Sequence, residues 1–285
     1  MSRGTESTVF SGLVPESEWD RMRAPNQEGA FPFPVKYGYA CVGMVESGPE
    51  ELLGRNVFGL FPHQTHFVAA PDTLHKLAPE IPVKRAVLAA NMETALNSLW
   101  DGLPSPGDHI CVVGGGVVGL LTAYLAARIP GTRVTVVDKN PERGDVATAL
   151  GAKFALPEKV PANQDLVFHA SSSSAGLETA LRAAGTGTTV IEMSWYGSRK
   201  VEASLGADFH ARRLALKSSQ VGTIPSARQP RWDFRRRLAL ALSLLDDPRL
   251  DLLLSHEISF HESPGRLPEL LSGEADALMP VLVYP

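Results

Sequence analysis

The stretch His109-Ile-Cys-Val-Val-Gly-Gly-Gly-Val-Val-Gly119 and the later run Thr132-Arg-Val-Thr-Val-Val-Asp138 decide the predicted fold of this chain. Ile110–Val113 is a short apolar run rich in β-branched residues, which is typical of a buried strand. A helical pattern follows it, and then a second β-branched run that ends in an acid. The order of strand, glycine turn, helix, strand and acid predicts a dinucleotide-binding βαβ unit. A glycine-rich turn that binds nothing is the alternative.

Each glycine of the G-x-G-x-x-G spacing has a physical role in such a unit. Gly114 permits the tight turn out of the strand, Gly116 lets the backbone approach a pyrophosphate, and Gly119 lets the helix pack closely. The pyrophosphate is expected on the free N–H groups at the helix N-terminus, at Val117 and Val118, where the helix dipole favours negative charge.

The acid at the end of the second strand indicates which dinucleotide binds. Asp138 follows Gly119 by about 20 residues, where an acid accepts hydrogen bonds from both hydroxyls of the adenosine ribose. A carboxylate there repels a 2′-phosphate, so the sequence favours NAD. Lys139 and Arg143 are close enough to weaken this preference, and NADP stays open.

Composition excludes several other classes of protein. The chain has 285 residues, with 44% hydrophobic and 20% charged residues, as expected for one large or two medium globular domains. A net charge of −4 gives no general attraction to nucleic acid. Cys41 and Cys111 lie in apolar, strand-like surroundings and are expected to be reduced core residues. No signal peptide is expected, and the glycines in Val112–Ala127 argue against a membrane span, so we expect a cytoplasmic protein.

The pattern before the glycine motif predicts a small all-β module. Met1–Gly29 is polar and is expected to be irregular. Tyr37–Val45, Asn56–Phe61 and His66–Ala70 are predicted strands. Pro82–Trp100 then changes to a helical period.

From His109 onward strands and helices alternate, which predicts an α/β fold with a doubly wound parallel sheet. The helix at Phe234–Leu245 has leucines nearly all round, so it is expected to be buried between layers or against another subunit. Its basic start, at Arg231 and Arg235–Arg237, is expected to be solvated, and contact with an acidic substrate or partner is the alternative. Further predicted strands are Asp165–Ala170, Thr188–Met193 and Leu214–Val221, with a closing strand, helix and strand at Leu252–Phe260, Arg266–Leu271 and Met279–Tyr284.

The order of segments resembles the medium-chain dehydrogenase/reductase superfamily over nearly the whole chain, and three segments carry the resemblance. Ser2-Arg-Gly-Thr-Glu6 is similar to its Cys-Gly-Ser/Thr-Asp segment, Tyr37-Gly-Tyr-Ala-Cys-Val-Gly43 to its Gly-His-Glu-x-x-Gly strand, and Leu253-Leu-Ser-His-Glu257 to its Ile-Thr-His segment. The resemblance implies a GroES-like β-rich catalytic domain at residues 1–80 and 252–285, and a Rossmann domain at 81–251. The catalytic domain is N-terminally short, so its first strands are expected to be absent or encoded upstream of Met1.

The positions that match the family's catalytic zinc ligands carry Arg3, Tyr39 and Ala90, and the four-cysteine zinc lobe is missing. We therefore expect a zinc-free member with no metal site. Within the superfamily, the Ser2–Glu6 segment and Ser194-Trp-Tyr-Gly197 also look similar to the bacteriochlorophyllide hydroxyethyl dehydrogenase group.

Without a metal, hydride transfer needs another group to polarise the substrate oxygen and move a proton. The resemblance places Tyr39 where a zinc ligand would lie, and Thr5 where the family relays protons. Arg3 is a candidate to stabilise an alkoxide, and Glu93 and His63 are candidate acid–base groups. The alternatives are that Tyr39 is an aromatic residue of the core, that Thr5 supplies only a hydroxyl in a turn, and that Arg3, Glu93 and His63 are solvated side chains.

Further cofactor contacts are predicted outside the glycine motif. The resemblance places Thr94 at the nicotinamide and the backbone from Ser219 to Val221 at its carboxamide. Ser171 follows a strand and precedes a helix, so it either bonds the cofactor or caps the helix.

The predicted function is a zinc-independent, NAD(P)-dependent oxidoreductase that interconverts an alcohol and a carbonyl on a largely apolar small molecule. The alternatives are a quinone or enone reductase of the same superfamily, and a nucleotide-binding redox sensor without catalysis. The family and the apolar helix at Phe234–Leu245 favour a homodimer.

Overall fold

The chain folds as two compact units in the computed structural model, which describes residues 1–272 and 275–285. Unit 1 contains Met1–Ala90, Gly197–Arg199 and Leu238–Pro285, and unit 2 contains Asn91–Tyr196 and Lys200–Arg237. The predicted domain borders, at residues 80 and 251, both fall within unit 1.

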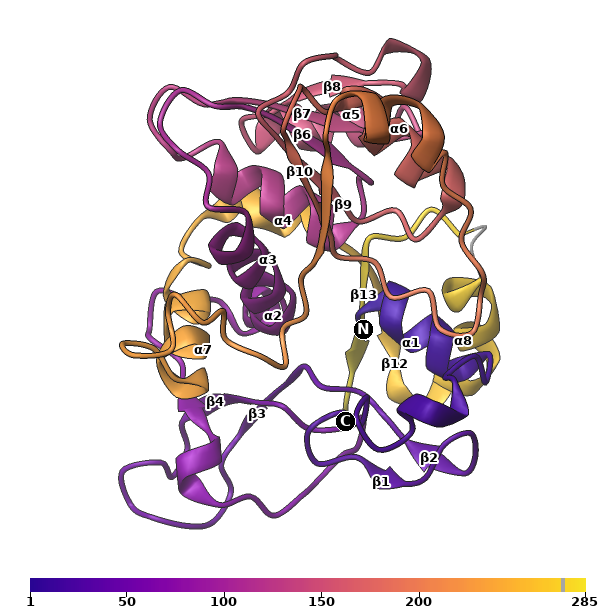
Figure 1. Ribbon diagram of the computed structural model, residues 1–285. Coiled ribbons are helices and arrows are strands. Elements are labelled where there is room, and N and C mark those ends of the chain that lie inside the picture. The colour runs from indigo at the N-terminus through magenta and orange to yellow at the C-terminus, as the bar shows by residue number, and fades with distance from the viewer. Residues whose placement is uncertain (273–274) are drawn as a thin grey trace. The chain divides into compact units, whose positions relative to one another are not determined.

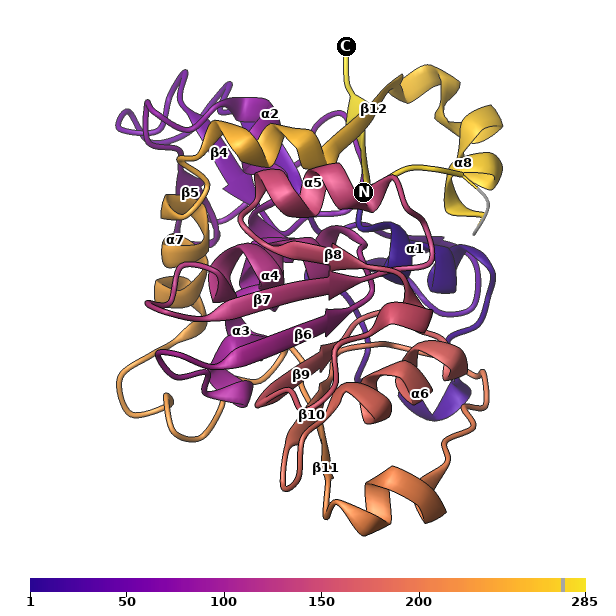
Figure 2. The same cartoon turned by 90° about the horizontal axis from the view of Figure 1, so that it is seen from above.

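Unit 2 is built on a six-stranded sheet in which every neighbouring pair is parallel. The strand order is β11-β10-β9-β6-β7-β8, and Figure 2 shows the strands laid out in this order. The order reverses direction between β6 and β9, as in a doubly wound dinucleotide-binding fold. The α/β prediction is confirmed. The strands are β6 (His109–Val113), β7 (Arg133–Val137), β8 (Lys153–Ala155), β9 (Leu166–His169), β10 (Thr189–Glu192) and β11 (Ala215–Ser218).

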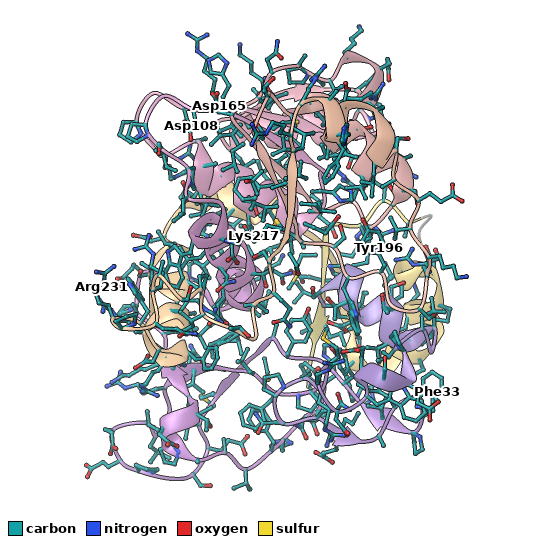
Figure 3. All side chains as sticks on the ribbon, in the orientation of Figure 1. Phe33, Asp108, Asp165, Tyr196, Lys217 and Arg231 are labelled. Carbon is teal, nitrogen blue, oxygen red and sulfur yellow. The ribbon has the colours of Figure 1, made fainter. Side chains whose placement is uncertain are left out.

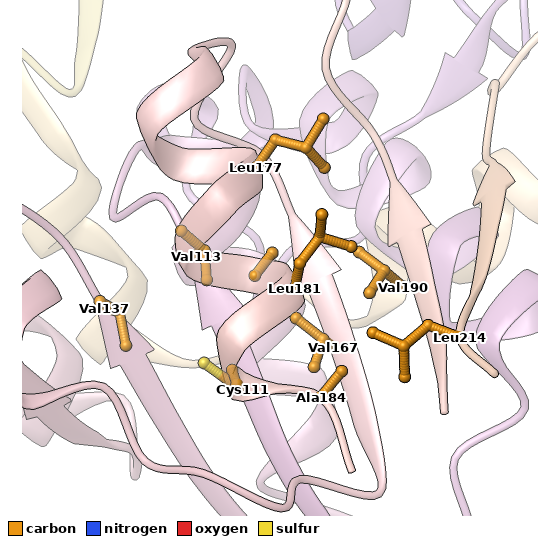
Figure 4. Packing of buried hydrophobic residues seen from close by; sticks show 11 residues of the cluster. Cys111, Val113, Val137, Val167, Leu177, Leu181, Ala184, Val190 and Leu214 are labelled. Carbon is orange, nitrogen blue, oxygen red and sulfur yellow. The ribbon is translucent and has the colours of Figure 1, made fainter. Parts of the chain in front are cut away.

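Helices α4 (Val117–Ala126) and α5 (Arg143–Ala149) follow β6 and β7, and α6 (Ser174–Ala183) follows β9. Right-handed crossovers that run in opposite directions along the sheet place α4 and α6 on opposite faces. The apolar side of α6 covers β6, β9 and β10 in a buried cluster (Figure 4). The members of this cluster on the strands include Cys111, Val113, Val167 and Val190.

Among its described residues, unit 1 contains three small sheets and the helices α1, α2 and α8, besides parts of two helices that it shares with unit 2. An antiparallel sheet has the order β3-β4-β5, β1 pairs with β2, and β12 pairs with β13 in parallel. The strands are β1 (Glu28–Gly29), β2 (Val35–Lys36), β3 (Cys41–Met44), β4 (Asn56–Gly59), β5 (His75–Lys76), β12 (Leu254–Ser259) and β13 (Met279–Val283); the helices are α1 (Arg3–Phe10), α2 (Val83–Ala86) and α8 (Ser263–Leu271).

Two predictions for unit 1 were wrong. Residues 1–29 are not wholly irregular, because Arg3–Phe10 forms α1, which packs on α8 (Figure 1). Its sequence has weak intrinsic helix propensity, so tertiary contacts of its buried face decide its structure. His66–Ala70 is not a strand; after a loop the chain pairs with β4 only at β5. The module is therefore not all-β.

Helices α3 (Ala89–Gly102) and α7 (Phe234–Ser243) each begin in one unit and end in the other. Within this single chain α7 is buried on one side only, since Phe234 is 55% exposed while Leu238 and Ala241 are buried. Burial between layers is therefore incomplete, and burial against another subunit stays a prediction. The prediction of a solvated basic start was wrong for Arg237, which is only 2% exposed.

Both cysteines are free thiols; Cys111 is buried, as predicted, whereas Cys41 is only half-buried, so the prediction that it lies in the core was wrong. Burial raises the pKa of Cys111 to about 12 and that of Cys41 to about 11, so both stay protonated at neutral pH. Within the described residues, no helix combines the length and apolar character needed to cross a bilayer.

Candidate active site

The glycine turn between β6 and α4 has the close contacts expected of a phosphate-binding loop. Gly114 has φ +114°, and a Cβ on it would lie 2.8 Å from the carbonyl carbon of Ala170. A Cβ on Gly119 would lie 1.9 Å from the Gly114 oxygen, so only glycine fits. A Cβ on Gly116 would meet nothing within 4 Å, which leaves open space beside the start of α4 at Val117. The turn and helix N-terminus therefore fit a dinucleotide pyrophosphate.

Asp138 at the end of β7 is tied to this turn by two backbone bonds. Its Oδ2 accepts from the N–H of Gly115 at 2.6 Å, and its Oδ1 accepts from the N–H of Asn140 at 2.8 Å. Lys139 is exposed, and the aliphatic stem of Arg143 packs beside Gly115. The sequence predicted an acid at position 138, but it did not predict the hydrogen bond of Asp138 to Gly115 in the glycine turn.

The other predicted cofactor residues lie on α3 and in the segments that follow β9 and β11. Thr94 is half-buried on α3. The Ser219 hydroxyl donates to Asp101 Oδ2 at 2.8 Å, and the carbonyl of Val221 accepts from Arg237 Nη2 at 2.6 Å. The Val221 oxygen is therefore already engaged by a protein group.

Ser171 lies directly after β9. Its Oγ lies 2.7 Å from Nε2 of His169. The cap of α6 is instead Ser173, whose hydroxyl accepts from the N–H of Gly176 at 3.0 Å. The alternative that Ser171 itself caps this helix was therefore wrong.

In unit 1 the structure brings together several of the predicted catalytic residues. The phenol of Tyr39 hydrogen-bonds with the side chains of Ser2 and Thr5 at the start of α1. Burial, and then the nearby negative charge of Glu6, raise the pKa of Tyr39 to about 12. Tyr39 is therefore a protonated hydrogen-bond donor at neutral pH.

His63 joins the same surroundings through Glu6. Its Nε2 lies 2.8 Å from Glu6 Oε2, and its Nδ1 lies 3.1 Å from the Tyr284 hydroxyl. Glu6 also accepts from the N–H of Ser2 at 2.7 Å. Burial opposes ionisation of Glu6, but the charge and hydrogen bond of His63 outweigh it and lower the pKa of Glu6 to about 2. Glu6 is thus a buried carboxylate beside a titratable imidazole.

Two candidates have other partners. The guanidinium of Arg3 donates to the carbonyls of Ala277 at 2.6 Å and Ser272 at 2.9 Å. Glu93 is buried on α3 and accepts from Arg237 Nε at 3.0 Å. Burial raises the pKa of Glu93, and Arg237 opposes that rise. Both side chains are engaged in bonds that stabilise the fold.

Sequence reasoning did not select Glu6 or Tyr284. Glu6 lies within the Ser2–Glu6 segment, so its acid beside a candidate hydroxyl was a usable signal. Tyr284 is separated from His63 by 221 residues, and no local pattern could connect them. Among residues 1–272 and 275–285, no group of three or more His, Cys, Asp or Glu side chains is arranged to hold a metal ion.

A family model described as DAO, FAD dependent oxidoreductase, matches residues 109–281. This match covers more than half of the chain, so the chain belongs to the family that the model describes. The match begins at the first residue of β6, and flavin and nicotinamide enzymes share the G-x-G-x-x-G βαβ unit that follows. The description differs from the family that the sequence resembles, and residues 1–108 lie outside the match.

Relatives that extend over the N-terminal residues are dehydrogenases. D-guloside 3-dehydrogenase of Escherichia coli K12 is 25% identical over 293 residues, covering 92% of this chain and 83% of its own. Among solved structures, an alcohol dehydrogenase from Thermus sp. ATN1 has a TM-score of 0.70 at 22% identity, covering 99% of this chain and 90% of its own. The fold of this chain is that of medium-chain alcohol dehydrogenases, which combine a GroES-like and a Rossmann domain. The dehydrogenase relatives and these neighbours support an alcohol dehydrogenase/reductase-type enzyme.

Solved neighbours within the superfamily hold nicotinamide cofactors. A protein from Sinorhizobium meliloti 1021 that is described as a zinc-binding dehydrogenase is bound to NADP; it has a TM-score of 0.73 at 18% identity, covering 98% of this chain and 88% of its own. An alcohol dehydrogenase from E. coli CFT073 is complexed with NADH, with a TM-score of 0.67 at 15% identity, covering 87% of this chain and 83% of its own.

Proposed function

We propose that this protein is a zinc-independent, NAD(H)-preferring dehydrogenase that interconverts an alcohol and a carbonyl on a largely apolar small molecule. The observation that supports it is the hydrogen-bonded set of Tyr39, Thr5 and Ser2. By the superfamily resemblance, Tyr39 of this set matches the position of a catalytic zinc ligand. Gly114–Gly119 and Asp138 would hold the dinucleotide, which supplies or takes the hydride.

The chain's own residues handle the substrate oxygen and its proton. The Tyr39 phenol donates a hydrogen bond to that oxygen, which stabilises developing alkoxide character during reduction. When Tyr39 gives its proton to the substrate oxygen, the hydroxyls of Thr5 and Ser2 hydrogen-bond to the phenolate oxygen, and water then returns a proton to Tyr39. The carboxylate of Glu6, held by His63, sets the local charge beside Tyr39.

Aromatic side chains beside Tyr39 support an apolar substrate. The Tyr37 ring lies 6.1 Å from the Tyr39 ring, edge to face, and 6.1 Å from Phe31. Together with the similarity at Ser194–Gly197, this extends the proposal to a hydroxyethyl group on a large planar ring such as a bacteriochlorophyllide.

The test is a steady-state assay of purified protein with NADH or NADPH against matched ketones, enones and quinones, before and after dialysis with a chelator. We expect ketone reduction with NADH that survives the chelator.

Loss of activity on chelation and recovery with zinc would contradict zinc independence. Exclusive turnover of enones or quinones would replace the proposal with the reductase alternative. Tight NADH binding without any turnover would favour the redox sensor. A protein that purifies with bound flavin would favour the FAD chemistry named by the family model.

A further inference from the structure

The segment Ser219–Val221 follows β11, which is an edge strand of the six-stranded sheet. All four residues of β11 are exposed, and within the described part of the chain its strand neighbour is β10 alone. An edge strand with one neighbour and exposed side chains leaves the position of the chain beyond it weakly determined. Bonds from outside the sheet therefore decide where this segment lies.

The last two turns of α3 hold the first part of the segment. The Asp101 carboxylate accepts from the Ser219 hydroxyl at 2.8 Å and from Asn97 Nδ2 at 3.2 Å. The same Asn97 amide donates to the carbonyl of Gln220 at 3.4 Å. Nζ of Lys217, on β11 itself, lies 3.2 Å from Asp101 Oδ1. These bonds join the carboxyl end of β11 to α3.

Arg237 on α7 holds the last residue of the segment. Its Nη2 donates to the Val221 carbonyl at 2.6 Å, its Nη1 to Asn97 Oδ1 at 2.5 Å, and its Nε to Glu93 Oε1 at 3.0 Å. The guanidinium is planar and its donors have a fixed geometry, so the three bonds set one another's directions. Arg237 is buried, and the Val221 carbonyl cannot move without breaking this buried set of bonds.

The place of the segment on the sheet relates it to one half of a bound dinucleotide. In doubly wound folds the dinucleotide lies outside the carboxyl ends of the strands, with one half on each side of the point where the strand order reverses. That point is between β6 and β9, and Asp138, the predicted acceptor for the adenosine ribose, follows β7 on one side. The nicotinamide half would then lie on the side of β9, β10 and β11, where Ser219–Val221 begins.

We propose that Arg237 is a positioning residue that holds the Val221 carbonyl where it accepts a hydrogen bond from the carboxamide of a bound nicotinamide. The inference rests on the dinucleotide site of the proposed function, and the carboxamide contact is the one that the superfamily resemblance implies. A carbonyl oxygen has two lone pairs, so the bond from Arg237 leaves one for an amide N–H of the ligand. Arg237 acts through the backbone of Val221 and does not touch the cofactor.

The test compares the dissociation constants of NADH and ADP-ribose, measured by isothermal titration calorimetry on the full chain. ADP-ribose keeps the adenosine, both phosphates and the second ribose, but it lacks the nicotinamide ring with its carboxamide. In Arg237→Lys a single ammonium group replaces the planar guanidinium, so the bonds to Glu93, Asn97 and Val221 cannot all be kept. We expect NADH binding to weaken roughly tenfold, as for one lost hydrogen bond, with ADP-ribose binding unchanged.

A second variant combines Glu93→Met with Arg237→Met, because this pair removes the bond to Val221 without leaving a buried unpaired charge. It is expected to show the same loss, for NADH alone. The matched control is Arg212→Met. The Arg212 guanidinium also donates to a backbone carbonyl, that of Ala184 at 2.9 Å, but these residues precede β11 and β10 and lie at the amino ends of the strands. This control is expected to bind both ligands as wild type does, and circular dichroism checks the fold of each variant.

NADH binding that is unchanged in both Arg237 variants overturns the inference and leaves the proposed function standing. Equal weakening of NADH and ADP-ribose overturns it as well, because a general loss of structure affects the whole site. Equal affinity of wild-type protein for the two ligands has the same consequence, since the nicotinamide would then contribute no binding. Wild-type protein that binds neither ligand contradicts the proposed function, and the inference falls with it.

Discussion

The carboxylate of Asp138 accepts a hydrogen bond from the backbone N–H of Gly115 at 2.6 Å, which joins the end of β7 to the glycine turn after β6. Asp138→Ala removes both this bond and the predicted acceptor for the adenosine ribose. We expect NADH binding to weaken about tenfold or more, which corresponds to roughly 1.4 kcal/mol. Nicotinamide fluorescence titration measures the change.

Asp165 supplies the control for that experiment. Its Oδ2 also accepts from a backbone N–H, that of His109, at 2.8 Å, but at the amino ends of the strands (Figure 3). Asp165→Ala removes a comparable hydrogen bond, but at the opposite end of β6 from the glycine turn. Equal weakening in the two variants would mean that Asp138 acts only through stability.

Tyr39→Phe removes the proposed donor to the substrate oxygen and keeps the ring. We expect kcat to fall about a hundredfold or more, as for loss of a general acid, with NADH binding unchanged. Tyr37→Phe is the control, because Tyr37 presents a neighbouring ring without the Ser2 and Thr5 bonds. Full activity in Tyr39→Phe would remove Tyr39 from the mechanism.

The Glu6–His63 pair predicts an acid-sensitive stability. Because the pKa of Glu6 is lowered to about 2 from 4.5, its ionised form stabilises the fold above about pH 4.5, and this contribution is lost as pH falls toward 2. Its full size is about 3 kcal/mol. Urea unfolding across this range is expected to show a steeper acid loss for wild type than for Glu6→Gln. Glu16→Gln, at an exposed carboxylate, should match wild type; parallel curves for all three proteins would refute the pairing.

The buried Arg237–Glu93 pair predicts a large asymmetry between single and double variants. Arg237→Met leaves the Glu93 carboxylate buried without its cation and is expected to cost about 3–5 kcal/mol of unfolding free energy. Replacing both residues with Met removes the unpaired charge and restores most of the loss. Denaturant titration measures both values, with exposed Arg236→Met as control. A double variant as unstable as the single one would contradict this account.

The local sequence patterns predicted unit 2 well, because each of its strands and helices has a recognisable pattern of its own. The glycine spacing, the β-branched strands and the apolar face of α6 all depend on residues near one another in sequence. The sheet order then follows from the general handedness of crossover connections.

Unit 1 was harder to predict because its structure depends on distant partners. Helix α1 forms on α8, more than 250 residues away in the sequence. The candidate residues Tyr39, Thr5 and His63 were named from family positions, whereas Glu6 and Tyr284 became visible only through contacts. Arg3 was named from the same positions, but its bonds to two carbonyls could not be foreseen.

The pairing of α1 with α8 and of β12 with β13 also bears on the order in which the polypeptide matures. The Met1 side chain shares a core with Ile258, Leu270 and Ala277, so that core closes only after residue 277 has been synthesised. Almost all of unit 2 is continuous from residue 91 to residue 237 and is synthesised before residue 258. Unit 2 is therefore able to begin folding during translation before unit 1, which carries Tyr39, can complete its core.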